Sequence, residues 1–260
     1  MKKIYLLVTL PLILLCMSCS DRKNDEVTIE NKTVISKITS TFYDTQSSPS
    51  VYTDVFAYDN NGNMTKMYGI NADGYSIFEY SSDKKLNKII HYGKDNKTIK
   101  FTDIFTYQGD QLIKYIADYE DKTSNRIIEY TYDNNGNLKT TSICEGPPCP
   151  IPHKTTFSYT DGNVKFMTSQ SPGSSYIPSN EYSYDNKQNP FINMNKYLRI
   201  LLSGRYLMSA NNVVTEKMNY SSSVITYTID YNTEGFPTKI LGKDQNNNNW
   251  VQYNYEYIKL

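Results

Sequence analysis

The chain of 260 residues has little of several residue types on which common functions depend. It contains 2 His and 4 Cys, so zinc sites and histidine-based catalytic motifs have few possible members. Lys+Arg and Asp+Glu each number 27, and this lack of a basic excess predicts no nucleic-acid partner. The N-terminal apolar run Ile4–Leu15 is shorter than the ~20 residues that a membrane-spanning helix needs.

That N-terminal run resembles a bacterial lipoprotein signal, which ends in a small residue before a cysteine that becomes lipidated. Ser18 and Cys19 fit the pattern, whereas Cys16 follows a bulky leucine and itself occupies a position where an aliphatic residue is usual. We therefore expect a signal peptide over 1–18, lipidation of Cys19, and a tether over 19–33. The alternative is an ordinary secretory signal with an incidental cysteine.

The lipoprotein interpretation predicts a protein of the cell envelope. Its membrane contact is the N-terminal lipid alone, at the outer membrane, with the remainder facing the periplasm or the cell surface. We expect residues 34–260 to form a single domain.

The remaining two cysteines lie close together in a proline-rich segment. Cys144 and Cys149 are five positions apart, and exported proteins meet an oxidising compartment, which favours a disulfide between them. The alternative is a metal site that adds His153, although zinc normally requires a fourth ligand or a water.

Tyrosine is abundant, with 25 Tyr against 9 Phe and 1 Trp, and it marks an internal repeat. The clearest copy is Ile127–Lys139, and Val55–Lys66 matches it closely. The repeats follow one another at intervals of roughly twenty-five residues. Their anchoring tyrosines are Tyr58, Tyr80, Tyr107, Tyr132, Tyr159 and Tyr184.

Each repeat predicts a β-hairpin. Ile128, Tyr130 and Tyr132 alternate with Glu129 and Thr131, a period of two that places apolar residues on one face. The following Asp-Asn-Asn-Gly-Asn segment has the composition of a tight turn. The sequence therefore predicts an all-β fold, a long antiparallel meander of about fourteen to sixteen strands that forms a curled sheet or partly closed barrel.

One segment has helical spacing instead. Met194, Tyr197, Leu198 and Leu201 form an apolar stripe, which predicts one short amphipathic helix over Phe191–Ser203. We expect this helix to pack on the concave aromatic face or to plug an end of the curl.

The Tyr-Asp-Asn-Asn-Gly-Asn-Leu/Met pattern resembles the YD repeat of RHS-type proteins. From about Val34 to Leu260 the chain resembles YD-repeat lipoproteins of Bacteroidota, which implies a meandering, porin-like sheet and a role that is not known. Tyr184–Phe191 and Tyr231–Ile240 also suit that family. The chain is too short for the long RHS arrays that enclose a cargo.

The polar face argues against an outer-membrane pore, because a lipid-facing strand surface is continuously apolar. We expect this face to meet water. Its members include Glu129, Thr131, Ser183, Asp185, Gln252, Asn254 and Glu256.

No catalytic, metal or cofactor site is evident. His91 and His153 lie outside known motifs, and Asp59–Asn63 resembles a calcium loop only in part, because it lacks the glycine and glutamate positions of an EF-hand. We therefore expect no enzyme, no metal and no cofactor. A pair of carboxylates acting on a carbohydrate is the enzyme alternative.

A binding or interaction module is the function that the tyrosines favour, with a glycan, a peptide or an envelope protein as partner. The alternatives are that the rings are simply the core, and that the chain is a structural scaffold whose polar face or sheet edge docks a partner. The candidate ligand-facing aromatics are Tyr130, Tyr132, Tyr182, Tyr184, Tyr227, Tyr231, Trp250, Tyr253 and Tyr255.

Overall fold

The period-two alternation produces sixteen antiparallel strands in the part of the chain that the computed structural model describes, which is residues 32–43, 48–146, 148–202 and 208–260. These residues belong to one unit, Asn31–Leu260. The expected signal peptide, Cys19 and nearly all of the expected tether lie outside the described residues. The first strand begins at Thr33, the last residue of that tether.

The strands follow one another along the chain with short connections. Those of the first half are β1 (Thr33–Phe42), β2 (Ser50–Tyr58), β3 (Met64–Gly69), β4 (Tyr75–Tyr80), β5 (Leu86–Tyr92), β6 (Ile99–Gln108), β7 (Gln111–Tyr119) and β8 (Arg126–Tyr132). Those of the second half are β9 (Leu138–Glu145), β10 (His153–Thr160), β11 (Asn163–Gln170), β12 (Ser179–Gln188), β13 (Asn211–Met218), β14 (Ser223–Tyr231), β15 (Pro237–Lys243) and β16 (Asn249–Lys259). Two helical elements have bounds within the described residues, the 3-10 turn η1 (Lys122–Ser124) and the helix α1 (Lys196–Leu201).

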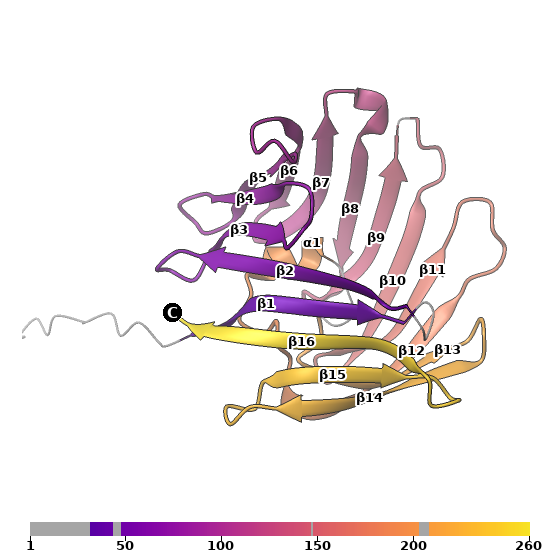
Figure 1. Ribbon diagram of the computed structural model, residues 1–260. Coiled ribbons are helices and arrows are strands. Elements are labelled where there is room, and N and C mark those ends of the chain that lie inside the picture. Colours follow the sequence, from indigo (N-terminus) through magenta and orange to yellow (C-terminus); the bar gives the residue numbers. More distant parts are fainter. Residues whose placement is uncertain (1–31, 44–47, 147, 203–207) are drawn as a thin grey trace, which may run out of the picture. The chain divides into compact units, whose positions relative to one another are not determined.

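Every strand pairs with its neighbours in sequence, and β1 pairs with β16 to close a barrel (Figure 1). The closing contact sets Val34 opposite Ile258 and Phe42 opposite Val251. A sheet of this many twisted strands curls, and closure removes both of its edges. The all-β prediction is confirmed.

The apolar face of the sheet turns into the barrel. Ile128 and Tyr130 are 6% and 4% exposed, whereas Glu129 between them is exposed. The same alternation along the other strands gathers one apolar core in the described part of the chain, and Tyr197 and Leu198 of α1 belong to it. The predicted orientation of the repeat is thus confirmed.

In most repeats the tyrosine that ends the first strand joins consecutive hairpins. Its hydroxyl donates to a backbone carbonyl of the preceding hairpin, usually at the start of that hairpin's return strand, over 2.6–3.0 Å. We call this set the tyrosine ladder. Its bonds are Tyr58 to Ile35, Tyr80 to Met64, Tyr107 to Leu86, Tyr132 to Leu112, Tyr184 to Val164 and Tyr257 to Pro237.

A β-bulge accompanies most ladder tyrosines. Thr131 pairs with Thr140 but Tyr132 pairs with Leu138, so Lys139 is the extra residue of the return strand. The register shifts in the same way before Tyr58, Tyr80 and Tyr107. Such bulges increase the local twist that a closed sheet needs.

The Asp-Asn-Asn-Gly-Asn turns hold themselves together. Asp133 Oδ1 accepts from the backbone amides of Asn135 and Asn137, and its Oδ2 accepts from the Asn137 side chain. That side-chain amide holds the pKa of Asp133 below its ordinary value. Gly136 has φ +82°, a conformation that favours glycine. With the carboxylate engaged within its own turn, the calcium alternative is not needed to explain these residues.

The helix is shorter than predicted. Phe191–Met194 forms turns, and α1 begins only after Asn195, whose side chain accepts from the Tyr197 amide as an N-cap. Asn189 caps the earlier turn by accepting from the Phe191 amide. Two asparagine caps in succession divide the segment, so the prediction of a helix from Phe191 was wrong; its expected end, 203, lies outside the described residues.

The outer wall carries paired charges as well as exposed apolar side chains such as Ile104 and Phe166. Lys37 of β1 pairs with Glu256 of β16 at 2.7 Å, and Lys165 of β11 pairs with Glu181 of β12 at 2.8 Å. Among the described residues, no helix is both long and apolar enough to cross a membrane.

The tyrosine ladder predicts that Tyr132→Phe lowers the free energy of unfolding by about 1–2 kcal/mol, because the Leu112 carbonyl, in a residue with 0% exposure, loses a donor. Urea titration measures this. Tyr52→Phe is the matched control, since Tyr52 is 59% exposed and outside the ladder. Equal effects of the two substitutions would contradict a stabilising role of the ladder.

The ladder also predicts a loss of stability at alkaline pH. Burial raises the pKa of Tyr132 to about 12, and those of Tyr58 and Tyr257 further. In the unfolded chain the tyrosine pKa is about 10, so the stabilisation is complete below that pH and is lost as pH rises through 12. The last part of the tyrosinate absorbance, which comes from the ladder, should appear together with loss of the β-sheet circular dichroism signal. Ionisation of every tyrosine near pH ~10 with an intact β-sheet signal would contradict the prediction.

Candidate functional site

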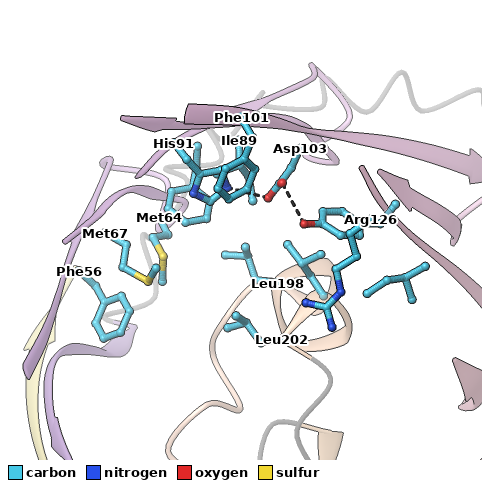
Figure 2. A pocket seen from close by; sticks show the side chains of 14 residues that line it. Phe56, Met64, Met67, Ile89, His91, Phe101, Asp103, Arg126, Leu198 and Leu202 are labelled. Atoms are coloured by element: carbon cyan, nitrogen blue, oxygen red, sulfur yellow. Dashed lines mark hydrogen bonds and ion pairs between the residues drawn. The ribbon is translucent and has the colours of Figure 1, made fainter. Parts of the chain in front are cut away.

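An apolar cavity of about 210 Å³ lies inside the barrel between the wall of β2–β8 and α1 (Figure 2). We call it the inner cavity. Leu198, Leu201 and Leu202 face it from the helix side. From the strands it is lined by Phe56, Met64, Met67, Phe78, Ile89, His91, Phe101, Asp103, Tyr115, Arg126 and Ile128.

The connection between β12 and β13 positions α1 by bonding to distant strand ends. Asn193 donates to the Thr33 carbonyl at 2.8 Å, and Asn195 donates to the Lys84 carbonyl in the β4–β5 turn at 3.3 Å. The Tyr197 hydroxyl donates to Asp110 in the β6–β7 turn. The helix is therefore held across one end of the barrel, with Leu198 turned inward.

A chain of polar groups borders the inner cavity. Ser76 Oγ lies 2.8 Å from His91 Nδ1, and His91 Nε2 lies 2.9 Å from Asp103 Oδ2. The Tyr115 hydroxyl donates to Asp103 Oδ1 at 3.0 Å. Burial, followed by the charge of Asp103, raises the pKa of Tyr115. An ionised carboxylate only accepts, so Nε2 carries a proton and Ser76 donates to Nδ1 when the imidazole is neutral.

Ring stacking holds this chain of groups in place. The His91 ring lies 4.0 Å from the Phe101 ring at 16°, and Phe101 lies 4.6 Å from Tyr119 at 23°. Three neighbouring strands, β5, β6 and β7, supply these rings. The imidazole therefore has a fixed orientation along the cavity wall.

The order serine, histidine, aspartate is also that of a hydrolytic triad, but its placement differs. Ser76 is 6% exposed and is not among the residues that line the inner cavity. A nucleophile must reach its substrate. The hydroxyl of Ser76 instead supports His91, and the chain of groups acts as a rigid polar border.

Arg126, the first residue of β8, completes the inner cavity (Figure 2). Its Nε lies 3.5 Å from Glu145 Oε1, and the two side chains are 46% and 75% exposed. Arg126 also lines a second space of about 690 Å³, which we call the outer pocket. The other residues of the outer pocket are Ile143, Glu145, Pro148, Cys149, Pro150, Ile151, His153 and Pro172.

The proline-rich loop of the outer pocket contains a disulfide. Cys144 and Cys149 are joined, with their Cα atoms 5.6 Å apart. Both sulfurs are thus unavailable as thiolate ligands, and His153 lies 3.4 Å from the hydroxyls of Ser169 and Ser171 instead. No cluster of three His, Cys, Asp or Glu suited to a metal occurs in the described residues.

None of the nine candidate ligand-facing aromatics lines the inner cavity. Most are engaged elsewhere in the interior, and Trp250 is 51% exposed. Tyr130, Tyr182, Tyr227 and Tyr255 are buried in the core; the hydroxyls of Tyr132 and Tyr184 belong to the ladder; Tyr231 donates to Asp185; Tyr253 packs against the core.

The residues of the inner cavity were missed by the sequence analysis, although two leave a signal. His91 and Asp103 occupy inward positions in strands whose side chains alternate between the two faces. Asp103, for example, lies two residues from both Phe101 and Phe105, which pack against the core. A polar residue on a buried face points to a partner. Arg126 has no comparable signal, because it opens its strand.

Comparisons with known proteins bear on the fold alone. No protein family matches the chain, and no curated protein matches its sequence. The crystal structure of a porin-like protein from Bacteroides uniformis ATCC 8492 is similar, with TM-score 0.57 and 12% identity, over 86% of this chain and 96% of that chain. A porin-like protein from Bacteroides vulgatus ATCC 8482 is matched with TM-score 0.43 and 12% identity, over 86% and 98%.

Proposed function

We propose that this protein is a non-enzymatic lipoprotein of the cell envelope, of the YD-repeat kind, whose barrel takes a small, mainly apolar molecule into its inner cavity. The main support for the proposal is the inner cavity, whose lining includes ten apolar side chains. An apolar cavity of about 150 Å³ is sufficient for benzene, so a volume of about 210 Å³ accommodates a somewhat larger compound.

The envelope location rests on the signal sequence and its Ser18-Cys19 junction. Similarity of fold to a porin-like protein of Bacteroides agrees with it. Ion pairs on the outer wall, such as Lys37–Glu256, favour attachment through the lipid rather than through the strands.

A structural scaffold is the second candidate, and the tyrosine ladder favours it. The ladder commits the hydroxyls that a glycan or peptide site would use, and the rings fill most of the interior. The two candidates differ in one measurable respect, which is whether a small apolar compound enters the barrel.

Octanol is a suitable neutral probe for the inner cavity. We expect calorimetry or ligand-observed NMR to detect its binding to the mature chain, and Leu202→Trp to abolish it by filling the cavity. Leu202 is 48% exposed, so the larger ring is accommodated without disturbing the buried core. Ile99→Trp is the control, since Ile99 is 53% exposed and outside the cavity. Absence of binding, or equal binding to both variants, would favour the scaffold.

The lipid anchor is tested separately. Cys19→Ala removes the acylated thiol, so we expect the protein to move from the membrane fraction to the soluble fraction and to lose labelling by a palmitate analogue. Cys16→Ala is the matched control and should leave both unchanged. Retention of Cys19→Ala in washed membranes would exclude anchoring by lipid at this residue.

A further inference from the structure

Four ionisable side chains line the inner cavity, and three of them, His91, Asp103 and Tyr115, are bonded to one another. Both oxygens of Asp103 accept hydrogen bonds, from Tyr115 and from His91, and Asp103 is 3% exposed. A carboxylate so enclosed has little capacity left for a ligand cation. The polar character that a ligand meets is therefore decided by the fourth group, Arg126.

Most N–H donors of the Arg126 guanidinium have no partner among the described residues. A guanidinium carries five N–H donors, and in the described residues Arg126 has one ion pair, from Nε to Glu145. Its terminal amino groups have no acceptor among the described residues. Figure 2 shows Arg126 at one side of the inner cavity, with Phe56 and Met67 at the other.

The ion pair with Glu145 is easily exchanged. Its atoms are 3.5 Å apart and the Glu145 side chain is 75% exposed, so the pair adds little stability. An acidic group arriving from the outer pocket meets a guanidinium that can bind it through two parallel bonds. Arg126 is the residue shared by the outer pocket and the inner cavity, so it stands where the two spaces meet.

We propose that the ligand of the inner cavity is an anionic amphiphile: an apolar body among Phe56, Phe78 and Leu198, and a single acidic head group on Arg126 at the junction with the outer pocket. This rests on the proposed function, to which it adds the chemical class of the ligand. The proline-rich disulfide loop forms one side of the path by which the head group enters.

Three probes of equal chain length test the head group: octanoate, octanol and octylamine. We expect octanoate to bind the mature chain about three- to tenfold more tightly than octanol, because the Arg126 side chain is 46% exposed and water screens part of a charge-assisted bond there. Octylamine should bind most weakly. Calorimetry at one pH and one salt concentration gives the three affinities.

Arg126→Met keeps the length of the side chain and removes the charge. In this variant octanoate and octanol should bind equally, while Arg126→Lys should keep a part of the preference. Lys37→Met is the matched control, because it removes a paired cation from the outer wall and should change no affinity. Circular dichroism verifies that each variant is folded.

Different binding results would overturn the head-group site and the apolar site. If octanol binds the unaltered chain as tightly as octanoate, or if Arg126→Met keeps the preference, the head-group assignment is wrong and the apolar site stands. If none of the three probes binds, both are wrong. Tighter binding of octylamine would instead assign the head-group site to Asp103.

Discussion

The hydroxyl of a tyrosine, bonded to a carbonyl of the preceding hairpin, is the contact on which the barrel depends. A bulge beside a ladder tyrosine, such as that at Lys139, twists the return strand. The tyrosine of the next hairpin then reaches a carbonyl near the start of that return strand, as Tyr132 does at Leu112. Phenylalanine would bury the same ring and leave that carbonyl without this donor. This requirement explains why the six ladder positions hold tyrosine rather than phenylalanine.

Two repeats depart from the ladder, and both lie where the β12–β13 connection enters the barrel. The Tyr159 hydroxyl donates to the sulfur of Met208, and Tyr231 donates to Asp185. Met208 belongs to the segment that follows α1, whereas Asp185 belongs to strand β12, so only the bond of Tyr159 is replaced by a contact to that segment. The segment that carries α1 creates the inner cavity, because Leu198, Leu201 and Leu202 do not fill the space opposite β2–β8.

The strands could be predicted because a period of two is a local property of the chain. Ile128, Glu129 and Tyr130 assign their own faces whatever the rest of the fold does. The start of α1 could not be predicted, because it depends on which asparagine side chain caps a nearby backbone amide. The inner cavity is further from prediction still. It brings together Phe56 and Arg126 from separate hairpins, and its existence depends on how completely a short helix fills a closed wall.

Closure by β1 and β16 has a consequence for how the chain reaches its native state. Every other pairing joins strands adjacent in sequence, so each hairpin can form as soon as it is available. The β1 edge, by contrast, waits for the last strand, Asn249–Lys259. Until then a growing sheet exposes two unpaired margins, which are open to intermolecular association. A polypeptide that crosses a membrane N-terminus first would keep one margin exposed throughout its passage, and only its final residues would end that vulnerability.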